Sequence, residues 1–369
     1  MARRGPLMRS IAVVGTGLIG TSVALAARSR GLTTYLLDRS SLAVGAAVAL
    51  NAGIAGPPPE PVDLAVIAVP PAQLATVLKE QQDRGLARCY TDVVSVKTRT
   101  RLAAARAGCD LSRFVGGHPM AGSERSGPFA AAADLFQGRN WVLTPSPSTD
   151  RQAIDLVLRL VALCGATPVL MEEEDHDRTV ALTSHAPHLV ASLLSARLES
   201  IGPATAQLIG QGLRDTTRIA GGSPGLWTDI LGANAVAVAE ILDGFAQDLG
   251  RALEALEQLG SEDPEHRRGG ERVLGELLTR GVAGQDRIPP RRDGRAGTPS
   301  SRVSVPVANR PGDVERLFAD VWSTGMHIVD LAVDHTPDAP VGRLDLIVDP
   351  EAAGDLASHL AERGWAARR

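Results

Sequence analysis

Short, almost wholly apolar runs alternate with stretches of helical periodicity over the first part of the chain. The runs at 10–14, 34–37, 64–69 and 89–93 are typical of buried strands, and residues 19–30 predict a helix after the first of them. Two further runs, at 114–117 and 140–144, indicate the last strands. Strands that alternate with helices predict a parallel, doubly wound sheet of the Rossmann type over residues 1–147.

The pattern changes after residue 150, where strand signals largely disappear. Long helical patterns follow, for example at 183–199 and 231–259, and they are rich in Ala and Leu and poor in charge. Such helices are more apolar than a solvent-facing bundle, so burial against a second copy of the chain is expected. We therefore predict an all-α domain at 148–283 that forms a homodimer.

The last part of the chain begins with a segment without apolar periodicity. Residues 284–300 are rich in Pro, Gly and Arg, which predicts a linker. Beyond it, a strand (302–307), a helix (312–323), two strands (326–333 and 343–348) and a second helix (351–363) are indicated. This β-α-β-β-α order predicts a small ferredoxin-like α+β domain over 301–369.

Composition narrows the class of protein. With 369 residues, 44% of them hydrophobic, the chain has material for more than one packed core. The 38 basic and 42 acidic residues give a net charge of −4, which shows no nucleic-acid footprint. No apolar run approaches the ~18 residues of a membrane span. Three scattered cysteines fit neither a disulfide framework nor a zinc site, so we expect a cytoplasmic protein without a metal.

A glycine-rich turn joins the first strand to the first helix. Gly15, Gly17 and Gly20 permit a tight turn and a close approach of a pyrophosphate to the helix N-terminus. Asp38 ends the second strand, 18 residues after Gly20, where an acid can bind the adenosine ribose hydroxyls and repel a 2′-phosphate. This favours NAD over NADP, although Arg39 weakens the preference and Asp38 could instead cap a turn. The predicted cofactor contacts are Gly15, Thr16, Gly17, Leu18, Ile19, Gly20, Asp38, Arg39, Val69 and Lys97.

Two further motifs follow strands of the same sheet. His118, flanked by glycines and Pro119, follows an apparent strand at the edge where open α/β sheets bind ligands. Imidazole titrates near neutrality, so we predict that His118 is a general base, the alternative being a structural histidine bonded to a loop carbonyl. Ser95 and Lys97 end the neighbouring strand and could reach the same site. Alternatively they are a helix cap and a solvated charge.

The helical region carries two more candidate motifs. His185 and His188 are three residues apart and share a helix face, where they could contact an anionic substrate or simply pack. A metal would need a third ligand, and none stands out. Asp215 and Arg218 precede a glycine-rich stretch, where Arg218 could hold a carboxylate with two hydrogen bonds. The alternative is a surface ion pair.

Taken together, these motifs resemble the prephenate/arogenate dehydrogenase family. The matching segments are 15–20, 92–97, 118–122 with Glu124, 184–188, and 215–218 with Trp227, in the family's order. The resemblance implies oxidative decarboxylation of prephenate to 4-hydroxyphenylpyruvate with hydride transfer to NAD, in tyrosine biosynthesis. It also implies a Rossmann domain followed by a helical dimerisation domain. Ala186 departs from the larger aliphatic residue expected between the two histidines, which bears on the shape of the pocket.

The resemblance also assigns roles to single residues. It implies that His118 deprotonates the ring hydroxyl, that Ser95 hydrogen-bonds the same group, that Arg218 holds a substrate carboxylate and that His188 lines the pocket. The predicted catalytic residues are thus His118 and Ser95. The predicted substrate contacts are Arg218, His188, His185, Glu124, Asp215 and Trp227.

The C-terminal module resembles an ACT domain. Asn309, Pro311 and Gly312 match the loop between first strand and first helix, where such domains hold amino acids. An amino-acid-binding module on a biosynthetic enzyme suggests feedback control, with tyrosine as the expected effector. Alternatively, the module only reinforces the dimer or has lost its ligand.

Three other functions remain open at this stage. Arogenate, which differs from prephenate in an amino group, fits the same residues and would give tyrosine directly. A β-hydroxyacid dehydrogenase also joins a Rossmann and a helical domain, but it would use a lysine base in the second domain and leave His118 unexplained. A non-catalytic sensor of NAD and an amino acid would have no need of His118, Ser95 and Arg218 together.

Overall fold

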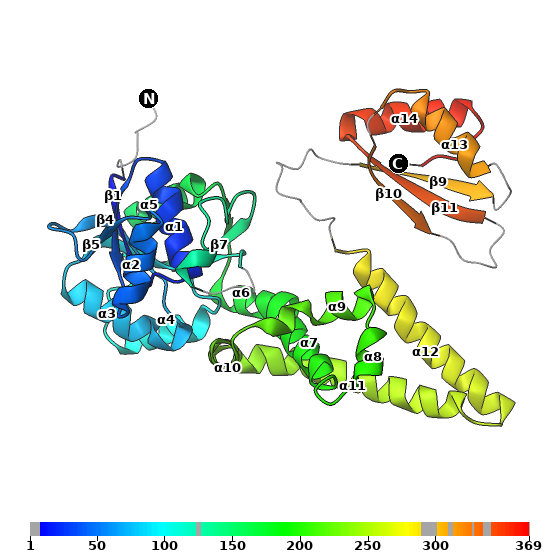
Figure 1. The fold of residues 1–369 in the computed structure, drawn as a ribbon, viewed down its shortest axis with the longest axis horizontal. Helices are drawn as coiled ribbons and strands as arrows, with labels where there is room; N and C mark the ends of the chain where they lie inside the picture. The colour runs from blue at the N-terminus through cyan, green and yellow to red at the C-terminus, as the bar shows by residue number, and fades with distance from the viewer. Residues whose placement is uncertain are drawn as a thin grey trace. The chain divides into compact units, whose positions relative to one another are not determined.

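The computed structural model describes residues 8–122, 127–288, 301–308, 313–326, 328–334 and 341–368. The chain divides near residue 289 into two compact units, which are described separately below. Figure 1 draws the ribbon of both units in the colours of the sequence.

The first unit is built on one sheet of eight strands in the order β3-β2-β1-β4-β5-β6-β7-β8. The strands from β3 to β6 are parallel, and the order reverses direction beside β1, as in a doubly wound fold. The predicted Rossmann-type sheet is therefore confirmed. The strands are β1 (Ser10–Val14), β2 (Thr33–Leu37), β3 (Ile54–Ala55), β4 (Val62–Ile67), β5 (Ala87–Asp92), β6 (Phe114–Pro119), β7 (Asn140–Thr144) and β8 (Thr167–Leu170).

Helices cover both faces of this sheet and create two hydrophobic cores (Figure 1). On one face pack α1 (Leu18–Ser29), α2 (Ser41–Ala49) and α5 (Arg151–Leu163), with the buried side chains of Val23, Ala47 and Leu160. On the other face pack α3 (Leu74–Asp83) and α4 (Thr98–Arg106). The strands between the layers are buried on both sides, which explains their continuous apolar runs. Short 3-10 turns, η1 (Pro71–Gln73) and η2 (Pro128–Ala130), complete this region.

Two features of the sheet differ from the sequence-based expectation. β7 runs antiparallel to β6, and the described residues of their connection contain only the short 3-10 turn η2. A parallel pair needs a longer crossover, usually an α-helix, so the expectation of a wholly parallel sheet was wrong for this pair. An eighth strand, β8, then pairs parallel with β7. β8 is short and mostly exposed at the sheet edge, so it lacks an apolar run. The expected domain boundary at 147 therefore falls inside the sheet-forming part, which extends to Leu170.

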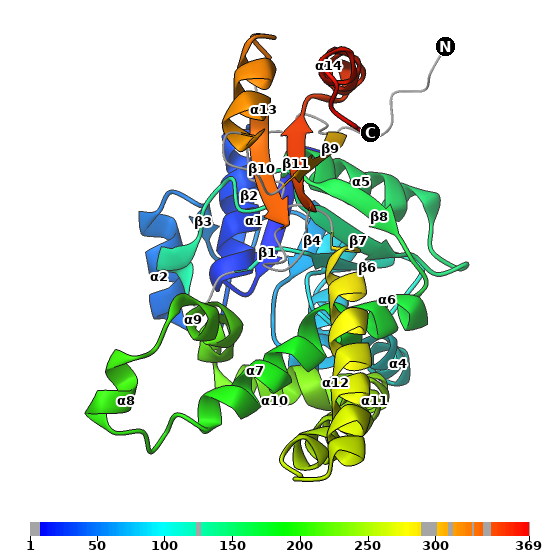
Figure 2. The same cartoon turned by 90° about the vertical axis from the view of Figure 1, so that its right-hand side faces the viewer.

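The remainder of the first unit is helical, as predicted. In Figure 2, α6, α7 and α10 lie beneath the sheet, and α11 and α12 form a pair of contacting helices. The elements are α6 (Glu173–Val180), the π-helical turn η3 (Ala181–His185), α7 (Ala186–Ala196), α8 (Pro203–Gln207), α9 (Gln211–Thr217), the 3-10 turn η4 (Arg218–Gly221), α10 (Pro224–Ala233), α11 (Ala235–Leu259) and α12 (Pro264–Gln285).

Both long helical patterns are interrupted in the structure. The pattern predicted at 183–199 begins within η3, and the pattern at 231–259 is divided by Asn234 into α10 and α11. Asn234 is buried, and its side-chain amide donates to the carbonyl oxygen of Asp177, which compensates the break. Both interruptions lie next to the histidines described below, and π-helical turns are often found at functional sites.

The second unit has the predicted β-α-β-β-α order. Its elements are β9 (Ser301–Ala308), α13 (Asp313–Trp322), β10 (Ile328–Asp334), β11 (Val341–Val348) and α14 (Pro350–Glu362). The sheet order is β10-β11-β9, with β11 antiparallel to both neighbours. Val303, Val305, Leu344 and Leu346 form its core with Leu317, Leu356 and Leu360 of the helices. The unit thus has a hydrophobic core of its own.

Among the described residues, no single helix combines the length and apolar composition of a membrane span. Only α10 and α11 taken together meet those criteria, and they are bent by 94° at their junction.

Candidate active site

The glycine-rich turn after β1 has the conformation that a bound pyrophosphate requires. Gly15 has a φ of +106°, and a Cβ there would lie 2.2 Å from the carbonyl oxygen of Ala68. A Cβ on Gly20 would lie 1.9 Å from the carbonyl oxygen of Gly15, so both positions need glycine for packing. At Gly17 the space is open, with nothing within 4 Å of such a Cβ. Helix α1 begins there without a side-chain cap, so its first N–H groups face this open space.

Asp38 lies at the end of β2 beside this turn. One carboxylate oxygen accepts hydrogen bonds from the backbone N–H of Thr16, at 2.7 Å, and from its hydroxyl, at 3.1 Å. The other accepts from the backbone N–H of Ser40, at 2.9 Å. Asp38 therefore caps a turn, and it also remains half-buried at the edge of the open space. The open space at Gly17, the uncapped N-terminus of α1 and the carboxylate of Asp38 together fit a bound dinucleotide.

The end of β5 is tied to β6 by a buried ion pair. The ammonium of Lys97 contacts Asp92 and donates to the carbonyl oxygen of Gly117 at 2.6 Å. Lys97 is 2% exposed and Asp92 is 1% exposed, so the alternative of a solvated charge at Lys97 was wrong. Burial raises the pKa of Asp92 and lowers that of Lys97, and their mutual attraction opposes both shifts. These contacts give Lys97 a structural role and lend no support to its predicted cofactor contact.

Ser95 and His118 follow or end two neighbouring strands of the sheet. Ser95 is half-buried in the turn between β5 and α4, and His118 lies within the last part of β6, the neighbouring strand. The two glycines before His118 allow the close packing: a Cβ on Gly116 would lie 2.4 Å from the hydroxyl of Thr144, and one on Gly117 would lie 2.5 Å from the carbonyl oxygen of Asp92. The glycines therefore hold the end of β6 against both neighbouring strands.

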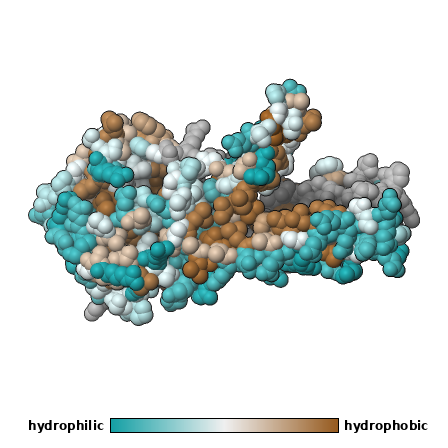
Figure 3. Space-filling view, turned by 90° about the horizontal axis from the view of Figure 1, so that it is seen from below, coloured by the Kyte–Doolittle hydropathy of each residue, from teal (hydrophilic) through white to brown (hydrophobic). Residues whose placement is uncertain are grey.

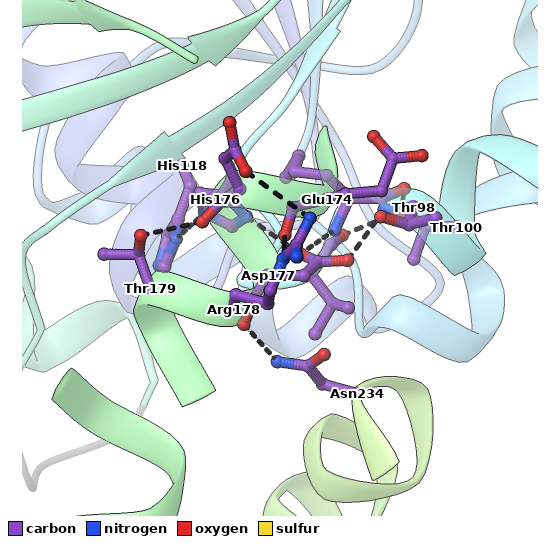
Figure 4. A network of polar contacts seen from close by, with 12 residues as sticks. Thr98, Thr100, His118, Glu174, His176, Asp177, Arg178, Thr179 and Asn234 are labelled. Atoms are coloured by element: carbon purple, nitrogen blue, oxygen red, sulfur yellow. Dashed lines mark hydrogen bonds and ion pairs between the residues drawn. The ribbon is translucent and has the colours of Figure 1, made fainter. Parts of the chain in front are cut away.

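A chain of hydrogen bonds runs from His118 into the helical region (Figure 4). Nδ1 of His118 is 2.9 Å from Nε2 of His176, and Nδ1 of His176 is 2.9 Å from a carboxylate oxygen of Asp177. The same carboxylate accepts from the backbone N–H groups of Lys97, at 2.8 Å, and Thr98, at 2.9 Å. His176 is fully buried, and Asp177 is 6% exposed. One carboxylate therefore contacts the histidine chain and the start of α4.

The electrostatics of this chain favour a neutral His118. Burial lowers the pKa of His118 well below its usual 6.5, and positive charge on His176, Lys97 or His185 would lower it further. Burial acts to raise the pKa of Asp177, but hydrogen bonds from His176 and from the backbone of Lys97 and Thr98 outweigh it and lower that pKa. Near neutral pH this series of hydrogen bonds therefore has an ionised carboxylate, that of Asp177, at one end and an unprotonated imidazole, that of His118, at the other.

His185 and His188 are both buried and both contact Trp227. The ring of His188 stacks on Trp227, with centroids 3.4 Å apart, and His185 meets the same indole edge-on at 6.2 Å. Nδ1 of His185 lies 3.1 Å from the side-chain amide of Asn234. Burial lowers the pKa of His185 to about 4 and also lowers that of His188. Both rings therefore have a role in packing against Trp227, and this role is compatible with a further contact to a substrate.

Arg218 begins η4, which packs against α7, the helix of His188. It is exposed, as is Asp215, whose carboxylate accepts from Gln211 at 2.9 Å. Glu124 and the loop residues Asn309, Pro311 and Gly312 lie outside the described residues. Within the described part of the chain, no group of three or more His, Cys, Asp or Glu side chains is arranged to hold a metal ion.

Comparison with known proteins identifies the family. The profile of the prephenate dehydrogenase nucleotide-binding domain matches residues 23–170, and that of the prephenate dehydrogenase dimerization domain matches residues 172–267. A Streptomyces niveus protein described as probable prephenate dehydrogenase NovF is 40% identical over 98% of this chain and 99% of its own length. The chain belongs to the prephenate dehydrogenase family.

Solved structures of the prephenate dehydrogenase family have the same fold as the first unit. Prephenate dehydrogenase from Aquifex aeolicus, solved in complex with hydroxyphenyl propionate and NAD+, is 26% identical with a TM-score of 0.66, covering 76% of this chain and 99% of that one. Synechocystis arogenate dehydrogenase is 28% identical with a TM-score of 0.59, covering 75% and 99%. Membership of this family makes the protein an NAD-dependent oxidoreductase, in agreement with the open glycine turn at β1.

Three residues of the site were missed by sequence reasoning. His176 and Asp177 lie in an acidic run that is typical of a solvated helix, and Asn234 lies inside a long apolar pattern. His176 is 58 positions from His118 in sequence, so no local pattern could have indicated their contact. The only available signal was a histidine followed by an acid within the charged run.

Proposed function

We propose that this enzyme oxidises and decarboxylates prephenate to 4-hydroxyphenylpyruvate in tyrosine biosynthesis, with NAD as the hydride acceptor. The observation that carries the proposal is His118, a neutral imidazole at the end of β6, bonded on Nδ1, in the same sheet as the turn that fits a dinucleotide. Family membership supports the same activity.

His118 takes the proton of the ring hydroxyl through its second nitrogen, and Ser95 hydrogen-bonds the same hydroxyl. NAD, when bound, receives the hydride from the carbon that bears this hydroxyl. The ring carboxylate then leaves as carbon dioxide, and its bonding electrons make the ring aromatic. The proton held by His118 can return to the phenol oxygen, so the base is regenerated. Release of carbon dioxide and aromatisation make the reaction irreversible.

The substrate is held from the helical side of the site. Arg218, at the start of η4, binds one carboxylate with charge-assisted hydrogen bonds, and Asp215, in the preceding helix α9, is a further proposed substrate contact. The stacked pair of His188 and Trp227 provides a flat wall, and His185, neutral because of its low pKa, meets the Trp227 ring edge-on. Glu124 remains a predicted substrate contact.

The experiment that tests this function is the appearance of NADH absorbance when protein, NAD and prephenate are mixed. Steady-state rates with prephenate and arogenate, each with NAD and NADP, assign the substrate and test the role of Asp38. We expect prephenate with NAD to give the highest kcat/KM. A preference for arogenate would instead assign to this enzyme the activity named for the Synechocystis protein, that of an arogenate dehydrogenase. A preference for NADP would exclude Asp38 as the selecting residue and point to Arg39.

We further propose that residues 301–369 form an ACT-like regulatory domain that binds tyrosine. The proposal is supported by the sheet order β10-β11-β9, which agrees with a ferredoxin-like fold, and by the pairing of Arg368 with Ser304 of β9, where such a fold has its last strand. Feedback requires that tyrosine bind one arrangement of the enzyme better than another. Truncation after residue 288 removes this separately folded unit. We expect the shortened enzyme to stay active with reduced tyrosine inhibition, whereas identical inhibition would mean competition at the active site.

The helical region is proposed to form a homodimer in the cytoplasm. Figure 3 shows apolar surface over this region, and Phe245, Leu249, Leu253 and Leu256 of α11 leave about half of their side-chain area exposed. A match to a dimerization domain supports burial of this surface against a second copy. The three cysteines are unpaired, which is consistent with a reducing compartment.

A further inference from the structure

The series of hydrogen bonds that ends at His118 begins at the carboxylate of Asp177. This group can only accept hydrogen bonds, so it determines which atom donates in each bond that follows. An ionised Asp177 has only acceptor oxygens, and the low pKa of this group keeps it ionised at neutral pH. Its oxygens receive two backbone N–H groups and Nδ1 of His176. The proton of a neutral His176 must therefore reside on Nδ1.

The position of this proton determines the next bond. With Nδ1 protonated, Nε2 of a neutral His176 carries a lone pair and can only accept. Its partner at 2.9 Å, Nδ1 of His118, must then be the donor. The lone pair of His118 is consequently on Nε2, the nitrogen that His176 does not contact. With His176 neutral, the opposite order of protons would require Asp177 to donate, which an ionised carboxylate cannot do; a doubly protonated His176 would instead donate to Nδ1 of His118, and the tautomer measurement below distinguishes the two.

We propose that His176 and Asp177 are positioning residues that hold His118 in the tautomer with an unprotonated Nε2, the form in which it acts as base. This rests on the proposed function of His118. The same carboxylate fixes the backbone of Lys97 and Thr98, so it also orients the turn that carries Ser95. Asp177 thus orients both predicted catalytic residues: His118 through His176, and Ser95 through the turn. It has no proposed contact with the substrate itself.

Burial supports a role beyond packing. His176 is 0% exposed, and a leucine of similar volume would fill an apolar position at lower cost, because a buried polar ring must keep its hydrogen bonds. Asp177 carries a charge that is offset by three hydrogen bonds at 2.8–2.9 Å. Polar groups at such positions are costly when any partner is lost.

The first test compares two substitutions of His176. In His176→Leu nothing holds the proton of His118 on Nδ1, so we expect kcat to fall by ~100-fold or more, the scale of acid–base catalysis. KM for prephenate and the Kd for NAD should stay within about threefold of wild type, since the variant leaves their contacts in place. In His176→Gln the side-chain carbonyl can accept from His118, so most of the kcat should return. If the leucine variant is as active as the glutamine variant, His176 only packs and the proposal is overturned.

The second test asks whether Asp177 acts through His176. Asp177→Asn should lower kcat strongly in wild type and by a smaller factor in the His176→Leu background, because coupled residues are not additive; the loss that remains there reports the contacts of Asp177 with the backbone of Lys97 and Thr98. Asp175→Asn is the matched control: this acid lies in the same helix, is exposed, and pairs only with Arg178 among the contacts described, so its kcat should not change. Additive losses from Asp177→Asn and His176→Leu would overturn the coupling.

The third test does not depend on activity. In protein labelled with 15N-histidine, the signals of His118, assigned by their loss in His118→Asn, should show a protonated Nδ1 and an unprotonated Nε2 at neutral pH. In His176→Leu the Nε2 signal should move towards the protonated value. A protonated Nε2 in the wild type overturns the proposal even if the enzyme is active. The expected tautomer in a protein that does not oxidise prephenate would overturn only the proposed function.

Discussion

At the scale of single residues, the proposed mechanism depends on one imidazole, that of His118. His118→Asn retains a polar side chain of similar reach but cannot accept a proton at neutral pH. We expect NAD affinity to be nearly unchanged and kcat to fall by ~100-fold or more, which single-turnover kinetics and NAD titration would measure. An asparagine variant with near-normal turnover would remove His118 from the role of base.

The pKa of His118 predicts the acid side of the pH profile. A base must be unprotonated to act, and burial places this pKa well below 6.5. Protonation therefore begins only below pH 6.5, and kcat/KM should be constant from neutral pH down to that value and decline beneath it. A decline that begins above pH 7 would show that a group other than a buried His118 controls the reaction.

Arg218 tests the substrate clamp. Hydrogen bonds to charged groups contribute about 1.5–3 kcal/mol, so Arg218→Ala should raise KM for prephenate roughly 10- to 100-fold. Arg214→Ala is the matched control, since Arg214 is exposed on α9, the short helix that directly precedes Arg218, and has no proposed role. Equal KM values in the two variants would mean that Arg218 is a surface residue without a role in substrate binding.

At the scale of elements, the packing of β6 against its neighbouring strands determines the position of His118. A Cβ on Gly116 would lie 2.4 Å from the hydroxyl of Thr144, so Gly116→Ala should destabilise the protein by about 1–3 kcal/mol in urea unfolding. Thr144→Ala removes that hydroxyl, and the loss caused by Gly116→Ala should shrink in this background. The same loss with and without the hydroxyl would exclude this contact as the cause.

Elements with a local cause were predictable from the sequence. The glycine turn before α1 was visible as a pattern within six residues, between a strand and a helix. The reason for the glycines before His118 was not visible in this way, because the atoms they accommodate belong to Thr144 and Asp92, which are distant in sequence. β8 was missed because an exposed edge strand has no apolar run, and β7 was assigned the wrong direction because strand direction depends on the connection. His176 and Asn234 were missed because their partners are distant in sequence and only tertiary packing brings them together.

At the scale of the whole molecule, the apolar stripe of α11 predicts the assembly. Leu253 is 56% exposed, and Leu253→Glu would place a charge in the proposed interface. We expect this variant to be monomeric at micromolar concentration in light scattering, while wild type is dimeric. Glu257→Gln, on the same helix, should leave the dimer intact. A dimer that persists in Leu253→Glu would mean that the copies associate through another surface.

The hydrogen bond between His118 and His176 has a consequence for recombination within the family. His118 lies in the segment matched by the nucleotide-binding profile, and His176 and Asp177 lie in the segment matched by the dimerization profile. A chimera joined at residue 171 would keep every cofactor motif and still depend on the incoming domain to supply a histidine and an acid at these positions. Under the proposed role of His176 and Asp177, the segment that must be exchanged together is longer than the nucleotide-binding domain, and we expect chimeras that preserve activity to have their junction after Asp177.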